Sequence, residues 1–168
     1  MTVSRRSFLA GIASSSLLTT PALALSAPTV RLSCLHTGAT CEINFDGSIS
    51  SRDAEAFRRA TWDWRRHTAY KMDLELIPLL AGISKFAGSD HTFGLISGYR
   101  TPETNRALNG TATKSYHMKG QALDIRRSDM RLSDLREAAT RLQIGGVGYY
   151  PQPRNNFVHV DTGPVRYW

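Results

Sequence analysis

The sequence predicts an α+β fold, a single domain in which helices flank an antiparallel or mixed central sheet that an N-terminal hairpin precedes. Three observations support this prediction. Segments with strand-like alternation and segments with helical spacing are intermixed along the chain. The late predicted strands are separated by short connections, which favour antiparallel or mixed pairing. The length of 168 residues allows one domain at most once a targeting segment has been removed.

Residues 1–24 have the three parts of an export signal. Arg5 and Arg6 precede a run of apolar and small residues, which ends at the small-x-small triplet 22–24. The string "SRRSFL" resembles the twin-arginine export signal, and an ordinary secretory signal is the alternative. We therefore expect residues 1–24 to be removed and residues 25–168 to form the mature domain. The mature protein is expected in the periplasm or cell envelope.

The mature chain has no second long apolar run, so we expect no integral membrane span. Without Arg5 and Arg6, the Lys and Arg count falls from 21 to 19 against 14 acidic residues, so the formal charge is +5. A mildly basic exported protein suits an anionic wall polymer or a membrane surface. The sequence has no basic and aromatic cluster of the kind that binds nucleic acid. We expect a monomer that does not bind nucleic acid.

Residues 30–45 are predicted to form the hairpin, followed by a turn at Asp46-Gly47. If Thr37-Gly38 is a two-residue turn, Cys34 faces Cys41 across the two strands. An oxidising compartment would then permit a disulfide, and two free thiols are the alternative.

The remaining elements follow from spacing and capping residues. Residues 51–67 carry apolar residues at helical spacing, and residues 73–87 form a second helix, capped by Asp73 and ended by Gly88. The other predicted elements are strands at 92–96, 122–126 and 157–161, a short helix at 102–108, a helix at 133–142 with Ser133 as its N-cap, and a glycine-rich turn at 144–151 that leads into a strand.

Alternation along two of these strands collects polar residues on one face. In "QALDIR" the two apolar residues point to the core, so Asp124 stands on the opposite face beside the small Ala122. In "NFVHVDTG" the two valines point away from the face that carries His159 and Asp161. Both strands therefore present groups of the kind that bind metals.

A third such group precedes the first strand. His117 lies in a loop, and Gly120 lets the chain turn sharply before Asp124. Together with His159 they offer two imidazoles and one carboxylate, a three-ligand set with an open fourth position, as catalytic zinc sites have. Asp161 would act as general base toward the attacking water or hold His159 in place. The alternative is that these residues are ordinary hydrogen-bonded polar groups.

The string "SYHMKGQALDI" matches the S-x-H-x-x-G-x-A-x-D pattern of zinc peptidases related to D-Ala-D-Ala carboxypeptidases and dipeptidases. "FVHVD" resembles the segment that gives the third zinc ligand, and "SGYRT" resembles a strand end that carries a substrate-binding Arg. Together with "LHTGAT", "GGVGYYP" and "NFVHVDTGPVRYW", these strings resemble exported murein endopeptidases of the MepK (YcbK-like) type. The resemblance extends over roughly residues 31–168 and is weakest between 50 and 90.

The resemblance implies one zinc ion per chain, held by His117, Asp124 and His159, so that residues 25–168 form a zinc peptidase domain. It also implies that Arg100 and Ser115 bind a carboxylate or carbonyl of the substrate. An Arg suits this role because its planar fork binds a carboxylate through two hydrogen bonds. A structural ion pair is the alternative for Arg100, and a turn residue is the alternative for Ser115.

The sequence departs from the wider family at the catalytic base. Many relatives carry a Glu three residues before the last ligand or a His two residues before it, and here these positions are Asn156 and Phe157. Asp161 is then the base by elimination. Tyr149 or Tyr150 is a candidate donor to the oxyanion, with aromatic packing as the alternative for either.

These observations predict a zinc-dependent peptidoglycan hydrolase, a murein endopeptidase that cuts a peptide bond in stem peptides or cross-links. Zinc lowers the pKa of a bound water and polarises the scissile carbonyl. The alternatives are a D,D- or L,D-carboxypeptidase that trims a terminal D-amino acid, and a non-catalytic zinc-bearing module that binds the wall.

Overall fold

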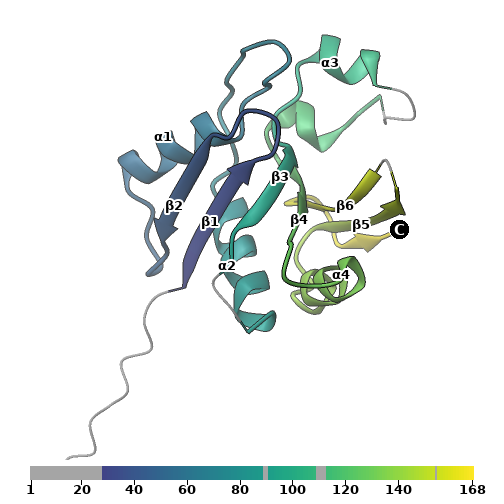
Figure 1. The fold of residues 1–168 in the computed structure, drawn as a ribbon. Coiled ribbons are helices and arrows are strands. Elements are labelled where there is room, and N and C mark those ends of the chain that lie inside the picture. The colour runs from purple at the N-terminus through teal and green to yellow at the C-terminus, as the bar shows by residue number, and fades with distance from the viewer. Residues whose placement is uncertain (1–27, 89–90, 109–112, 154) are drawn as a thin grey trace, which may run out of the picture.

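The computed structural model describes residues 28–88, 91–108, 113–153 and 155–168, and the predicted export signal at 1–24 lies outside them (Figure 1). Within these residues the chain forms one seven-stranded mixed sheet with strand order β2-β1-β3-β4-β6-β5-β7. The strands are β1 (Thr29–Cys34), β2 (Thr40–Asn44), β3 (Phe93–Ser97), β4 (Ala122–Arg126), β5 (Gly146–Gln152), β6 (Asn155–Asp161) and β7 (Arg166–Tyr167). The helices are α1 (Ser51–Ala60), α2 (Leu76–Phe86), α3 (Pro102–Ala107), the 3-10 helix η1 (Tyr116–Lys119) and α4 (Leu132–Arg141). The α+β prediction is confirmed, and the predicted hairpin forms one edge of this same sheet.

The core lies between one face of the sheet and the helices α1, α2 and α4 (Figure 1). Alternation in β4 and β6 fills this face as predicted, because Leu123, Ile125, Val158 and Val160 are fully buried. Burying a side chain of this size contributes roughly 1.5–3 kcal/mol. The opposite face of the same strands is therefore left for polar groups. Among the described residues no helix is long and apolar enough to cross a lipid bilayer.

The predicted helix 51–67 is too long, since α1 ends at Ala60. The Thr61 hydroxyl bonds the carbonyl of Phe57 at 2.7 Å and closes the last turn. The chain then turns back, and Asp63 pairs with Thr68 in an isolated antiparallel bridge. Tertiary contacts made by this turn, described below, outweigh the helical spacing that continues past Ala60.

Two helix starts also differ from the predictions. The predicted cap Asp73 precedes α2 by three residues, and its side chain accepts hydrogen bonds from the Glu75 N–H at 3.1 Å and the Thr162 hydroxyl at 2.7 Å. The helix α4 begins one residue before Ser133, so Ser133 is not its N-cap; Arg131 occupies that position. A two-residue strand such as β7 is too short to show any alternation and was not predicted.

The predicted register of the hairpin is wrong. Cys41 pairs with Leu32, and the Cys34 N–H donates to the carbonyl of Ala39 at 2.8 Å, so four residues close the turn instead of two. Cys34 and Cys41 therefore do not face one another, and both are free thiols in the core. Burial raises the pKa of the Cys41 thiol to about 11, which keeps it protonated and unreactive.

The pairing of the central strands aligns five residues in one row across the sheet. Ser97 of β3 lies opposite Asp124 of β4, and Asp124 lies opposite His159 of β6. His159 in turn faces Gly148 of β5. Trp168 continues the β5–β7 ladder beside Gly148, because its N–H and C=O bond the residues before and after that glycine. We call this line of residues the transverse row.

A β-bulge in β3 brings Ser97 into the transverse row. The register passes from Leu95 opposite Ile125 to Ser97 opposite Asp124, so Ile96 is an extra residue. An extra residue shifts the alternation of the strand by one position. Ser97 therefore shares the face of Asp124, although uninterrupted alternation would place it with Leu95.

Candidate metal centre

Three elements bring the predicted ligands together at the centre of the sheet. His117 comes from η1, Asp124 from β4 and His159 from β6, and all three are buried. His117 Nε2 lies 3.1 Å from Asp124 Oδ1 and 3.2 Å from His159 Nδ1, and the last two atoms are 3.0 Å apart. Tetrahedral zinc with bonds of about 2.0–2.1 Å requires ligand atoms about 3.3 Å apart. The three atoms therefore have nearly the spacing of one face of a zinc tetrahedron.

The local structure around His117 follows from the two residues that bracket η1. Ser115 is its N-cap, and the Ser115 hydroxyl accepts a hydrogen bond from the His117 N–H at 3.3 Å. Gly120 ends η1 with φ +70°, and a Cβ there would lie 2.5 Å from the carbonyl oxygen of Lys71. Only glycine meets both conditions, so the sharp turn predicted from the sequence is present.

Hydrogen bonds on the outer side of each imidazole fix which nitrogen faces the centre. His117 Nδ1 lies 2.7 Å from the carbonyl of Gly98, which only accepts, so Nδ1 carries the proton. His159 Nε2 lies 2.9 Å from Asp161 Oδ2, so Nε2 carries the proton there. Two nitrogen lone pairs and the Asp124 carboxylate then converge on one point. A cation satisfies all three at once, so the residues present fit a bound zinc ion.

The Asp161 carboxylate is fully buried and its two oxygens are engaged by several donors. Oδ1 accepts from the N–H groups of Gly146 and Gly163 at 3.0 and 2.8 Å. Arg166 donates to both oxygens, at 3.1 and 2.6 Å, and His159 donates to Oδ2. Burial alone would raise the pKa of Asp161, but the hydrogen bonds from His159, Arg166 and the two amides lower it well below its usual range. Asp161 is therefore an anion that holds the ring of His159.

Arg100 lies on the other side of the ligand set. Its Nε donates to the Ser97 hydroxyl at 2.8 Å, and its Nη2 forms an ion pair with Asp124 Oδ2. The loop that carries Arg100 is tied to the turn after α1, because Asp63 Oδ2 accepts from the N–H and hydroxyl of Thr101 at 2.8 and 3.0 Å. Burial opposes ionisation of Asp124, but the neighbouring His117 imidazole and the charge of Arg100 hold its pKa well below the usual range.

The structure also places the other residues considered from the sequence. The Tyr150 hydroxyl accepts a hydrogen bond from Trp168 Nε1 at 2.7 Å, and its ring stacks on Phe157 with centroids 4.7 Å apart. Tyr149 packs against the core and beneath the guanidinium of Arg136. Neither tyrosine makes a hydrogen bond to a predicted zinc ligand among the contacts of the described residues.

The sequence analysis assigned no role to Asp63, Gly98, Arg166 or Trp168. The contribution of Gly98 is a backbone carbonyl, which no residue type reveals. Arg166 and Trp168 lie in the quoted string "NFVHVDTGPVRYW", and an Arg five residues after an Asp was the available signal. Their approach to the site depends on the parallel pairing of β7 with β5. A strand of two residues is too short to be predicted from the sequence.

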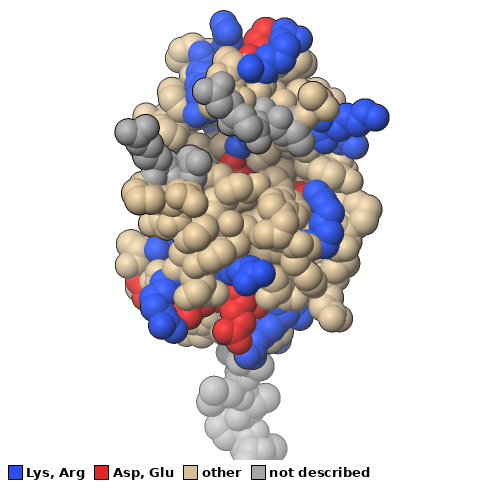
Figure 2. Space-filling view, turned by 90° about the vertical axis from the view of Figure 1, so that its right-hand side faces the viewer, with Lys and Arg blue, Asp and Glu red and all other residues tan. Residues whose placement is uncertain are grey.

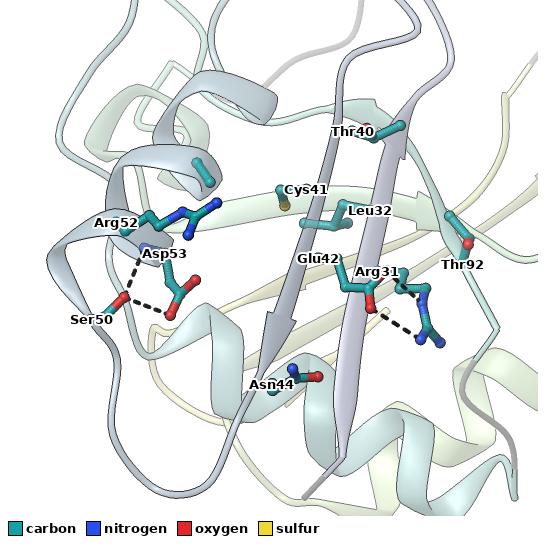
Figure 3. A pocket seen from close by; sticks show the side chains of 11 residues that line it. Arg31, Leu32, Thr40, Cys41, Glu42, Asn44, Ser50, Arg52, Asp53 and Thr92 are labelled. Atoms are coloured by element: carbon teal, nitrogen blue, oxygen red, sulfur yellow. Dashed lines mark hydrogen bonds and ion pairs between the residues drawn. The ribbon is translucent and has the colours of Figure 1, made fainter.

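A cavity of about 770 Å³ lies elsewhere, between β1, β2 and the start of α1 (Figure 3). Its walls include the exposed ion pair of Arg31 with Glu42 at 3.0 Å and the Ser50–Asp53 cap of α1. It shares no lining residue with the metal centre and holds no convergent set of imidazoles. The side of the molecule with the chain end marked C in Figure 1 is instead hollowed across its middle, with acidic and basic atoms visible inside the hollow (Figure 2).

Comparison with known proteins identifies the family of this chain. A family model described as peptidoglycan L,D-endopeptidase MepK matches residues 23–168. The peptidoglycan L,D-endopeptidase MepK of Escherichia coli strain K12 is 41% identical over 177 residues, which cover 98% of this chain and 96% of that protein. The probable peptidoglycan L,D-endopeptidase MepK of Haemophilus influenzae is 41% identical over 111 residues, which cover 63% of this chain and 59% of that protein. The converging imidazoles and carboxylate thus lie within a sequence match that spans almost the whole chain, and the chain belongs to the M15 peptidase family of peptidoglycan L,D-endopeptidase MepK.

Proposed function

We propose that this protein is a zinc-dependent peptidoglycan endopeptidase that cuts an L,D-peptide bond in stem peptides or cross-links. The convergence of two nitrogen lone pairs and one carboxylate oxygen within 3.2 Å of one another carries this proposal. Membership of the MepK family supplies the substrate class and the type of bond. One zinc ion per chain would be held by His117, Asp124 and His159.

Zinc in this position would polarise the scissile carbonyl and lower the pKa of a water molecule toward neutrality. The protein's own residues prepare the position for it. The Gly98 carbonyl and the Asp161 carboxylate keep the protons of the two imidazoles on their outer nitrogens. Arg100 neutralises the Asp124 oxygen that does not face the centre. The ligand atoms are therefore arranged before the metal arrives.

In addition to its ion pair with Asp124, Arg100 is proposed to bind a carboxylate or carbonyl of the substrate. The residue is only 9% exposed, and Ser97 and Asp124 fix the direction of its fork. A rigid guanidinium beside a metal ligand orients a peptide with little entropic cost. Ser115, which caps η1 through its hydroxyl, is proposed to contribute a weaker polar contact at the same edge.

Asp161 is proposed to act mainly by positioning His159. Both carboxylate oxygens accept hydrogen bonds, and the residue has no exposed surface. The alternative role, general base toward the attacking water, requires one oxygen to leave these donors during the reaction. The Asp161→Asn variant described in the Discussion separates the two roles.

The protein is further proposed to act in the periplasm or cell envelope, because peptidoglycan is found there and residues 1–24 have the pattern of an export signal. We propose export by the twin-arginine route and function as a monomer. Fusion of residues 1–24 to a folded reporter, with Arg5 and Arg6 replaced by Lys in a control, tests the route. Export that is unchanged in the control would contradict it.

Digestion of purified peptidoglycan with the protein tests the activity, with the products identified by mass spectrometry. We expect fragments cut at an internal L,D-bond, complete loss of cleavage with a chelator, and recovery after addition of zinc. Release of single D-amino acids would instead identify a carboxypeptidase. Binding to peptidoglycan without any new fragment would identify a wall-binding module, and cleavage that persists in the chelator would contradict the zinc requirement.

A further inference from the structure

The transverse row continues beyond the metal ligands to an aromatic residue. Trp168 lies next to Gly148, which faces His159, and the indole and imidazole ring centroids are 5.4 Å apart. A Cβ on Gly148 would lie only 2.7 Å from Cε2 of the indole. The ring therefore crosses β5 at the one position of the row that has no side chain. Gly148 provides the space through which Trp168 reaches a predicted zinc ligand.

The indole is held in this place from several directions. Its Nε1 donates to the Tyr150 hydroxyl at 2.7 Å, and the Tyr150 ring stacks on Phe157. The guanidinium of Arg166 lies 5.1 Å from the indole centroid and is itself bound to Asp161. Backbone hydrogen bonds on both sides of Trp168 complete the support. The orientation of the ring is thus fixed without help from a ligand.

A ring held this firmly would be expected in the interior, yet Trp168 is 46% exposed. Tyr150 and Phe157, which complete the group, are half-buried. We call these three residues the aromatic wall. A rigid, half-exposed aromatic surface beside a catalytic centre offers a large contact area at little entropic cost, which is typical of ligand-binding walls. Directly below the hollow in Figure 2, most of the surface carries no Lys, Arg, Asp or Glu.

The two ends of the transverse row differ in chemistry. Beyond Asp124 the row reaches Ser97 and the cationic Arg100, whereas beyond His159 it reaches the aromatic wall. A peptide that lies along the row would meet a charge on one side of the metal and an apolar surface on the other. The row therefore gives the substrate a direction.

We propose that Trp168 is a substrate-contacting residue that determines specificity, with its indole packed against an uncharged, aliphatic part of the peptide on one side of the scissile bond. The carboxylate or carbonyl on the other side binds at Arg100. This inference rests on the proposed function, because it takes the substrate to be a peptidoglycan peptide that is cut at the metal centre.

Steady-state kinetics on a purified cross-linked muropeptide, measured beside zinc content, test the proposal. Trp168→Ala should raise KM by about 10-fold or more, as truncation of a central aromatic contact does, with a smaller change in kcat and one zinc per chain retained. Gly148→Ala should do the same, because the added methyl group displaces the indole while Trp168 itself is kept. Trp168→Phe should lie between these variants and the wild type.

Tyr167→Phe serves as the matched control. Its side chain belongs to the same strand but reaches the other way, with its hydroxyl 3.3 Å from the Thr140 carbonyl of α4. KM should not change in this variant. Unchanged KM in Trp168→Ala and Gly148→Ala would overturn the proposal. Loss of zinc from both would also overturn it, because Trp168 would then only support His159.

A binding measurement distinguishes failure of this inference from failure of the proposed function. The muropeptide is titrated into wild type and Trp168→Phe after removal of the metal with a chelator, and tryptophan fluorescence is recorded. Wild type should respond and Trp168→Phe should not, whether or not the loaded protein cleaves the peptide. An equal response in both proteins would show that the peptide does not reach Trp168.

Discussion

The two histidines of the candidate metal centre are held in different ways. The outer nitrogen of His117 donates to the backbone carbonyl of Gly98, which is part of the chain whatever residues surround it. The outer nitrogen of His159 donates to a carboxylate, which depends in turn on Arg166 and two backbone amides. One imidazole is thus fixed by the backbone. The other is fixed by two side chains, Asp161 and Arg166, which substitution can remove one at a time; we call these two residues the relay.

The two rings also differ in proton affinity. Burial lowers the pKa of His117 and outweighs the charge of Asp124, so this ring favours the neutral form. Burial also disfavours charge on His159, but hydrogen bonds to Asp124 and Asp161 outweigh it and raise the pKa of this ring. A carboxylate behind an imidazole makes it a stronger base, and therefore a better metal ligand, than a carbonyl does. The relay thus strengthens the ligand that the backbone does not support.

The largest expected effect on zinc affinity comes from replacing His117 itself, because no residue behind a ligand can take the place of the ligand. His117→Ala removes a direct ligand, so zinc affinity should fall by more than the roughly 100-fold limit typical of changes behind a ligand. Metal analysis after dialysis against a zinc buffer measures this loss, and circular dichroism checks the fold. One zinc per chain in correctly folded His117→Ala would remove His117 from the ligand set.

Asp161→Asn should reduce zinc affinity by roughly 10- to 100-fold, because the amide no longer holds the His159 proton as a carboxylate does. If Asp161 mainly positions His159, most of the turnover should return at saturating zinc. If it is the general base, turnover should stay about 10²- to 10⁴-fold low even when the site is full. Competition with a zinc chelator and the turnover number on one muropeptide, measured together, decide between the two roles.

Arg166→Met should have a smaller effect of the same kind. Asp161 loses two hydrogen bonds, at 3.1 and 2.6 Å, but keeps those of Gly146 and Gly163. We expect zinc affinity to fall by roughly 10-fold, the lower end of the range for such positions, and to recover in part in Arg166→Lys. Arg141→Met, which removes an exposed ion pair with Glu137, is the control. Equal zinc affinity in Arg166→Met and wild type would show that Arg166 does not help Asp161 to hold His159.

Ser115→Ala should have the smallest effect on zinc affinity and should act on it through the fold alone. The variant removes the cap of η1 and should lower the free energy of unfolding by about 0.5–2 kcal/mol, the usual cost of a lost N-cap. Zinc affinity should change less than in Asp161→Asn, because the Gly98 carbonyl still holds the ring of His117. Urea unfolding and chelator competition measure the two quantities. A loss of affinity larger than that of Asp161→Asn would show that the backbone support is weak.

Local rules predicted the parts of the site that lie within one element. Period-two alternation placed Asp124, His159 and Asp161 on the face opposite the core, and the turn at Gly120 is present. The supports of the ligands were not predictable in this way. Gly98 and Arg166 reach the site through strand pairings that no local pattern specifies, and the bulge at Ile96 shifts Ser97 against its alternation.

The fold was likewise predicted only in part. The class and the central strands were confirmed because their apolar periodicity is strong. The predicted end of the first helix was wrong. The carboxylate of Asp63 binds Thr101, and this tertiary contact overrides the helical spacing. The Cys34–Cys41 register was wrong because it assumed the shortest turn, and a four-residue turn moves the partner of Cys41 to Leu32.

The pairing of Asp124 with His159 also disfavours shifted registers between β4 and β6. A slip of one residue between β4 and β6 would turn valines toward the polar face and bury His159 and Asp161 in the core. A slip of two residues keeps the faces but sets Asp124 opposite Asp161, where like charges repel, or opposite Phe157, where a buried carboxylate has no partner. Of these neighbouring alignments, only the observed one gives the carboxylate a complementary group. The chemistry of the site therefore discriminates against the wrong registers while the chain folds, before any metal or substrate is bound.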